Sequence, residues 1–176
     1  MDLTTLRFPR QLEADGTEEK VRRALTARTE RLWSGGVSEV PVLSLGKSLG
    51  EALQRARMRG RIRCGFEVAS DRMAQEKKGI ARVRAEGDTS YGDRVSRLLL
   101  CSSDGAERLY RHIDVLLAAH APRLLVCRLD ADAVALGGLI AGRGVRIKVV
   151  LVEHKDDCTA ALQAIAADAW IPEKAS

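Results

Sequence analysis

Apolar residues follow two spacings along the chain, and together they predict strands that alternate with helices. Short continuous apolar runs indicate buried strands, and the apolar positions three and four residues apart that follow each run indicate amphipathic helices. The clearest of these strands are 98–101, 124–127 and 145–152. Because strands alternate with helices without a tight hairpin, we expect an α/β fold with a mostly parallel sheet that is covered on both faces.

Residues 1–46 are predicted to form an N-terminal arm and helix ahead of the main domain, residues 47–176. The helix begins at Thr17, a good N-cap, and a Gly-Gly pair at positions 35 and 36 ends it. It packs on the main domain or on a partner. A short strand follows at 40–43, and we expect it at an edge of the sheet because its proline cannot donate within a central ladder.

The main domain opens with a helix, a short basic strand and a second helix. The first helix ends at Gly60, the strand covers 61–64, and Gly65 makes the turn into the second helix. That helix ends at Lys77-Lys78-Gly79, because cations suit the C-terminal end of a helix. Residues 79–96 are mixed and polar, and we predict a long loop or a short hairpin there.

Composition narrows the setting in which the protein works. Hydrophobic residues make up 45% of the 176 positions, which is enough for a folded core. No apolar run approaches the roughly 20 residues that span a bilayer, and the N-terminus lacks the basic and apolar regions of a signal peptide. The four cysteines stand far apart, with no close pair for zinc. We therefore expect a cytoplasmic protein with reduced cysteines and no membrane partner.

Positive charge is concentrated in one stretch of the sequence. Residues 47–84 hold 11 Lys and Arg against 4 Asp and Glu, a net of +7, whereas the whole chain has +5. Arginine occupies every second position from Arg55 to Arg63, and Arg59, Arg61 and Arg63 are the ones expected beside the short strand. Locally concentrated cations suit a polyanion such as structured RNA. The alternative interpretation is a basic helix face that is exposed to solvent and binds no ligand, since it would have the same concentration of positive charge.

The basic stretch also carries a family resemblance, over about residues 47–168. From Leu49-Gly50-Glu51-Ala52-Leu53 through Arg61-Ile62-Arg63-Cys64-Gly65-Phe66-Glu67-Val68, the chain resembles the kink-turn-binding ribosomal protein superfamily, that is, the large-subunit seven-Ae and thirty-e type and their small bacterial relatives. Those proteins have an alanine-rich helix, a basic strand, and a Gly-x-Glu-type or Gly-x-Asn-Glu-type turn that opens the second helix. The later order is similar too: strand, helix, strand, a Leu-Gly segment (here Leu136-Gly137) and a valine-rich strand.

The resemblance implies a three-layer α/β/α sandwich that binds structured RNA, such as ribosomal RNA, without catalysis or a cofactor. Gly65 would let the backbone approach the RNA, Glu67 would accept from a base edge, and the loop 128–138 would close over the other side. Phe66 stands where the RNA-binding members have asparagine, so we expect contacts with the RNA backbone in place of paired base readout. The RNA-binding residues predicted in this way are Arg59, Arg61, Arg63, Gly65, Glu67, Lys77, Lys78, Arg128 and Gly137.

Three aspartates offer an enzymatic alternative. Asp104, Asp130 and Asp132 follow apolar strands, and carboxylates gathered at the carboxyl edge of a parallel sheet could hold Mg²⁺ for RNA cleavage. The run 129–132 is similar to the metal-dependent PIN-like nucleases. The same aspartates are also good helix N-caps, which is their commonest role at such positions, and Asp104 with Glu107 matches a capping box.

Two other features bear on function. Gly46-Lys47-Ser48 is similar to the end of a phosphate-binding P-loop, but Pro41 stands where that loop needs a small residue, so we expect no nucleotide cofactor. A third function class is a protein-interaction subunit, in which the N-terminal helix and the basic face dock onto an acidic partner protein.

Overall fold

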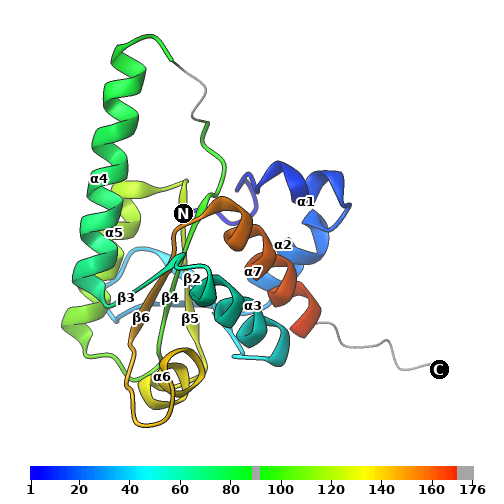
Figure 1. Cartoon of the computed structure of the whole chain (residues 1–176), viewed down its shortest axis with the longest axis vertical. Helices are drawn as coiled ribbons and strands as arrows, with labels where there is room; N and C mark the ends of the chain where they lie inside the picture. The colour runs from blue at the N-terminus through cyan, green and yellow to red at the C-terminus, as the bar shows by residue number, and fades with distance from the viewer. Residues whose placement is uncertain (89–91, 170–176) are drawn as a thin grey trace.

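The computed structural model describes residues 1–88 and 92–169, and these form an α/β fold around one mixed sheet (Figure 1). In chain order the elements are α1 (Arg10–Ala14), α2 (Glu18–Thr26), β1 (Thr29–Arg31), β2 (Glu39–Leu43), α3 (Lys47–Met58), β3 (Ile62–Cys64), α4 (Phe66–Ala85), β4 (Arg97–Cys101), α5 (Glu107–His120), β5 (Leu124–Leu129), α6 (Ala133–Ala141), β6 (Val149–Val152) and α7 (Lys155–Asp168). The strands lie in the order β1-β2-β5-β4-β6-β3. The predicted α/β class is confirmed.

Parallel pairing is confined to the centre of the sheet. β5 is parallel to both of its neighbours, β2 and β4, whereas β1, β6 and β3 join through antiparallel pairs. The prediction of a mostly parallel sheet is therefore wrong for the flanking strands. The antiparallel direction of β6 follows from the position of α6, which lies at the edge of the sheet where β5 ends (Figure 1). Because the chain does not cross back over the sheet, β6 begins at that same edge and runs antiparallel to β4. We call this the carboxyl edge, because β2, β4 and β5 end there.

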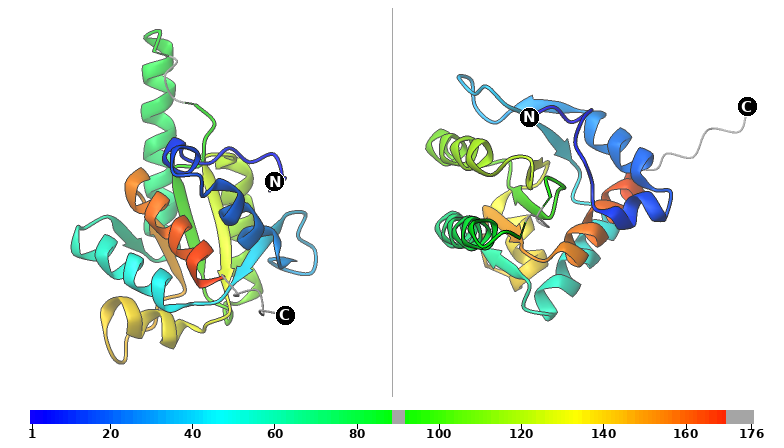
Figure 2. Two further views of the ribbon diagram at one scale, coloured as in Figure 1. Left: turned by 90° about the vertical axis from the view of Figure 1, so that its right-hand side faces the viewer. Right: turned by 90° about the horizontal axis from the view of Figure 1, so that it is seen from above.

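Alternate residues of the central strands feed two hydrophobic cores, one on each face of the sheet. In β4, Leu98 and Leu100 pack with α3 and α7, whereas Leu99 and Cys101 pack with α4 and α5. Side chains of successive strand residues point to opposite faces, so a continuous apolar run such as Arg97–Cys101 is stable only when both faces are covered. Figure 2 shows the helices on the two sides of the sheet.

Residues 1–46 pack into the same core as the rest of the chain. The division of the chain into an N-terminal part and a main domain at residue 47 stays a prediction. The N-terminal helix ends at Thr26 and not at the Gly-Gly pair, and the chain continues into β1. β2 lies between β1 and β5, so the predicted edge position is wrong. Its proline is tolerated because the ladder with β5 begins one residue later, at Val42. Buried residues of this segment join the core beside α7: Leu3, Leu6, Phe8, Leu12, Val21, Ala24 and Leu25.

Helix α4 is longer than its sequence pattern predicts. The loop predicted from residue 79 is wrong for its first part, because α4 continues to Ala85 and its last turns extend beyond the rest of the molecule (Figure 1). Residues 80–85 are alanine, arginine, isoleucine and valine, which tolerate a helix well once it has been started by the buried first half. Gly87, with φ of +93°, follows the end of the helix. Positions 89–91 of the predicted loop lie outside the described residues.

Among the described residues, we find no helix that combines the length and the apolar character needed to cross a bilayer.

Candidate functional site

The alternating arginines from Arg55 to Arg63, here called the arginine row, are divided between the end of α3 and the strand β3, as expected. Three of them form ion pairs within the protein. Arg59 and Arg61 donate to Asp157 of α7 at 3.0 and 3.3 Å, and the Asp157 side chain is only 2% exposed. Arg63 of β3 donates to Glu153 at 3.1 Å. These contacts clamp β3 to α7 and to the end of β6, so these three arginines have a structural role.

The turn between β3 and α4 is open and lies at the carboxyl edge. Gly65 has φ of +98°, a region that L side chains rarely adopt, and a Cβ built on it would meet no atom within 4 Å. Its N–H donates to the Val149 carbonyl at 2.8 Å, which fixes the turn against the start of β6. Glu67 is exposed in the first turn of α4. Phe66 instead packs on His112 of α5, with ring centroids 5.7 Å apart.

A second basic segment lies beside this turn, and the sequence reasoning missed it. The predicted strand 145–152 begins only at Val149, so residues 142–148 form a loop that buries Ile147 and exposes Arg143, Arg146 and Lys148. The loop is tied to the carboxyl edge because the Lys148 carbonyl accepts from the Ser102 N–H at 2.9 Å. Two glycines with positive φ, at 142 and 144, flank Arg143. That Gly-Arg-Gly turn followed by alternating cations is the signal that could have revealed the loop.

The remaining predicted RNA-binding residues lie away from the turn. Lys77 and Lys78 are farther along α4, roughly 16 Å from its first residue at 1.5 Å per residue. Arg128 of β5 pairs with Glu30 of β1, across the sheet from β3. Gly137 is buried in α6, where a Cβ would lie 1.9 Å from the Val145 carbonyl oxygen, so it permits close packing and cannot meet a ligand. Of the predicted residues, Gly65, Glu67 and the exposed Arg63, which is paired with Glu153, thus remain together at the turn.

The three aspartates of the enzymatic alternative serve other purposes. Asp132 is the N-cap of α6 and accepts from the Ala135 N–H at 2.8 Å, as the capping interpretation predicts. Asp104 does not cap α5, which starts after Ala106; it accepts from the first amide of α6 at 2.9 Å. Asp130 pairs with Arg28. Within residues 1–88 and 92–169, no group of three His, Cys, Asp or Glu side chains is placed to hold a metal ion.

The P-loop-like segment is occupied by a carboxylate of the chain itself. Asp168, at the end of α7, accepts from the amides of Ser48 and Leu49 at 3.0 and 2.9 Å, where a phosphate would otherwise sit. A Cβ on Gly46 would lie 2.4 Å from the Asp168 carboxyl carbon. Glycine is therefore required at position 46 to let this carboxylate reach the helix, and the segment has a capping role.

We expect Asp168→Ala to lower the free energy of unfolding by about 1–2 kcal/mol, because the first amides of α3 lose their partner and the helix dipole loses its anion. Urea unfolding followed by circular dichroism measures the change. Glu51→Ala, on the exposed side of the same helix, is the matched control and should change it by less than about 0.5 kcal/mol. Equal effects of the two substitutions would contradict the capping role.

The N-terminal helix does not present a free apolar face. Val21, Ala24 and Leu25 of α2 are buried in the core of the chain itself, against α7. The apolar stripe that suggested a docking helix is thereby accounted for within the molecule.

Comparisons with known proteins add little to this picture. No protein-family model and no curated protein matches the chain. A solved structure described as a protein with unknown function from Bacillus halodurans is similar over 68% of this chain and 96% of its own, with a TM-score of 0.43 and 14% sequence identity. A likeness at this level carries no argument about function.

Proposed function

We propose that this chain is a non-enzymatic protein that binds structured RNA at the carboxyl edge of its sheet. The observation that carries the proposal is the juxtaposition of two segments: the open Gly65 turn, and the exposed loop 142–148 with its three cations, joined by the 2.8 Å hydrogen bond from Gly65 to Val149. One segment offers the first amides of α4 at a helix N-terminus, and the other offers flexible positive side chains. Both are what RNA phosphates require.

Each part of this surface has a distinct role in the proposal. Arg143, Arg146 and Lys148 contact phosphates, since the weak 3.8 Å contact between Arg146 and Asp104 leaves the guanidinium free to move toward a ligand. Glu67 accepts from a base edge at the start of α4. Arg63, which shares Glu153 with Arg72, lines the surface beside the turn.

The resemblance to the kink-turn-binding superfamily supports the proposal through element order. An alanine-rich helix (α3), a basic strand (β3), the Gly65 turn, α4, and then strand, helix, strand and a final valine-rich strand follow one another as in that family. In this proposal the helices on the two sheet faces make up the three-layer sandwich of the family. Phe66 turns toward His112 and cannot replace the family's asparagine, so binding is directed to the RNA backbone and shape.

Structured RNA fits better than an unpaired strand. Single-strand binders stack successive bases on aromatic side chains, but the whole chain holds only two Trp, two Tyr and two Phe. Phe66 packs with α5, and Trp33 is covered by the Arg111 guanidinium, 4.6 Å from the ring centroid.

Cysteine alkylation tests where the RNA lies, because Cys64 is exposed directly before Gly65. Burial raises the pKa of Cys101 and Cys158 to about 12 and that of Cys127 well above its ordinary value, so these thiols stay protonated and inaccessible. Partial burial also raises the pKa of the Cys64 thiol, but this thiol is exposed, so iodoacetamide at pH 8.5 is expected to modify Cys64 alone in the folded protein. A saturating hairpin RNA with an internal loop should slow that modification at least about fivefold, since a ligand on the turn covers the thiol.

Mass spectrometry of tryptic peptides measures the rate at each cysteine. A single-stranded RNA of equal length is the control, and it should protect Cys64 less. If the hairpin binds but leaves the Cys64 rate unchanged, the RNA lies elsewhere and the proposed surface is wrong.

A further inference from the structure

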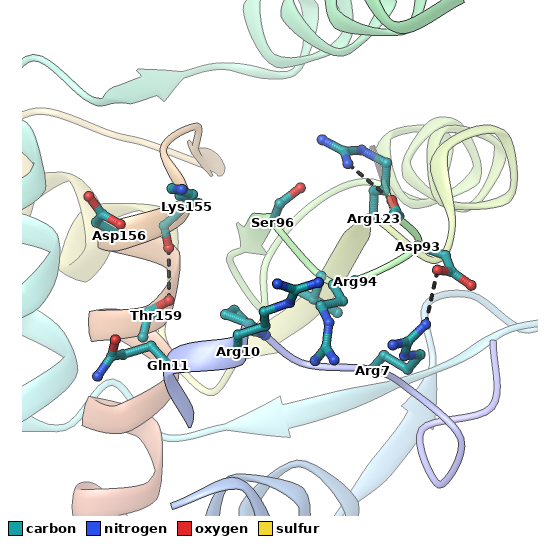
Figure 3. A pocket seen from close by; sticks show the side chains of 13 residues that line it. Arg7, Arg10, Gln11, Asp93, Arg94, Ser96, Arg123, Lys155, Asp156 and Thr159 are labelled. Carbon is teal, nitrogen blue, oxygen red and sulfur yellow. Dashed lines mark hydrogen bonds and ion pairs between the residues drawn. The ribbon is translucent and has the colours of Figure 1, made fainter. Parts of the chain in front are cut away.

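A second basic site lies at the opposite edge of the sheet, where β4 and β5 begin and β6 ends. It is a cavity of about 850 Å³ between three segments that are far apart in the sequence: the N-terminal arm, the residues that lead into β4, and the first turn of α7 (Figure 3). Arg123, just before β5, completes it. The lining residues that carry charge are Arg7, Arg10, Asp93, Arg94, Arg123, Lys155 and Asp156.

Two of these arginines fix the frame of the cavity. Arg94 donates to the Phe8 carbonyl at 2.8 Å and to Glu13 at 2.5 Å, and so ties the N-terminal arm to the segment before β4. Arg123 donates to Glu76 of α4 at 2.6 Å. Glu13 largely neutralises Arg94, whereas Arg123 shares Glu76 with Arg97 and keeps part of its charge. These ion pairs fix both guanidinium groups in position. They hold the walls in place before a ligand arrives, which lowers the entropy lost on binding.

The other three cations of the lining, Arg7, Arg10 and Lys155, are not neutralised by close ion pairs within the described part of the chain. The side chains of Arg10 and Lys155 are exposed and make no hydrogen bond or ion pair with any residue that the structure describes. Arg7 makes only a long contact, 3.4 Å, with the exposed carboxylate of Asp93, and such a pair contributes little free energy. Arg10 and Lys155 reach the cavity from two different helices, α1 and α7.

The start of α7 adds a further positive contribution. This helix has 14 residues, and its first amides have no partners within the helix, so its N-terminal end carries partial positive charge. The Nδ1 atom of His154, the N-cap, accepts from the Asp156 amide at 3.3 Å and also lies 3.4 Å from the Arg61 guanidinium. The helix end, Lys155 and the arm therefore converge on one cavity.

We propose that this cavity binds a small molecule that carries two or more linked phosphate groups. Its volume lies within the range of small-molecule sites, and its lining holds five cations against two acidic residues. The cations converge on a concave site and do not form a stripe along one element, as a nucleic-acid backbone would require. The site is independent of the proposed RNA surface, because the two lie at opposite edges of the sheet.

Isothermal titration of the full chain with inorganic pyrophosphate, at about 50 mM salt, tests the site directly. The variant Arg10→Glu/Lys155→Glu should bind pyrophosphate at least about tenfold more weakly, because each charge-assisted contact to a phosphate is worth about a factor of ten before solvent screening. Both positions begin a helix, where glutamate is favourable, so the variant is expected to fold. Arg143→Glu/Arg146→Glu, with the same change in charge, should bind pyrophosphate like the unmodified chain.

The same proteins are then tested with the hairpin RNA, which separates the two possible sources of the phosphate groups. Loss of pyrophosphate binding with retained RNA binding in Arg10→Glu/Lys155→Glu supports a separate small-molecule site. No heat from pyrophosphate with the unmodified chain, or equal affinity in the two variants, overturns the proposal. Parallel loss of RNA and pyrophosphate binding in Arg10→Glu/Lys155→Glu also overturns it, since the cavity would then be part of the RNA footprint.

Discussion

Replacing Arg59 and Arg61 together by alanine is expected to lower the free energy of unfolding by about 3–5 kcal/mol. The two arginines are the partners of Asp157, whose side chain is 2% exposed. Their removal leaves a carboxylate buried without a counter-charge, and this is among the most costly changes that a folded protein can undergo. Chemical denaturation, with the midpoint and slope fitted for each variant, measures the loss.

The chain offers a close control for this experiment. Arg55→Ala/Arg57→Ala removes two exposed arginines from the same end of α3, and it should cost less than about 1 kcal/mol. Adding Asp157→Asn to the Arg59→Ala/Arg61→Ala variant should restore part of the lost stability, because the buried charge is then gone. Equal losses of unfolding free energy in the two double variants, or no recovery of stability with Asp157→Asn, would contradict the structural role of Arg59 and Arg61.

The ion pairs of Arg59 and Arg61 with Asp157, and of Arg63 with Glu153, change the interpretation of the arginine row. Reversing Arg59, Arg61 and Arg63 to glutamate looks from the sequence like a clean test of RNA binding. In the folded protein it would place new acids against Asp157 and Glu153 and disturb the fold. Loss of RNA binding in such a variant would not distinguish a binding role from a structural one.

The central part of the fold could be predicted from the sequence because its signals are local. The apolar runs that became β4 and β5 are continuous, and the spacing of Ile113, Leu116 and Leu117 defines the inner face of α5. The direction of β6 could not be predicted, because it depends on α6 remaining at one edge of the sheet. The extension of α4 to Ala85 was also hidden, since those residues have little amphipathic pattern.

The candidate site was predictable only in part, for the same physical reason. The Gly65 turn follows from a glycine between a strand and a helix, and it is where the sequence places it. The partners of the arginines, Glu153 and Asp157, are 90 or more residues away in the sequence, so no local pattern shows that the arginines are paired. The sequence around Gly137 likewise does not show whether this glycine binds a ligand or permits close packing. The close approach of its backbone to the Val145 carbonyl shows that it has a packing role.

The loop 142–148 is the part of the surface on which RNA affinity is expected to depend most. Arg143→Glu/Arg146→Glu/Lys148→Glu should raise the Kd for the hairpin RNA by at least about 100-fold, because three phosphate contacts are replaced by repulsion. All three residues are exposed and only Arg146 has an ion-pair partner, at 3.8 Å, so the fold should be unchanged by circular dichroism. The matched control, Lys20→Glu/Arg23→Glu/Arg31→Glu, makes the same change in net charge on the N-terminal segment.

The dependence of RNA affinity on salt tests the central claim most directly. With Arg143, Arg146 and Lys148 replaced by alanine, the slope of log K against log salt concentration should fall in magnitude by about two to three, because each phosphate that is no longer neutralised keeps its counterion. Alanine at Lys20, Arg23 and Arg31 should leave the slope unchanged. Equal slopes in the two triple variants, or no binding of the hairpin by the unmodified chain at about 50 mM salt, would contradict RNA binding at the carboxyl edge.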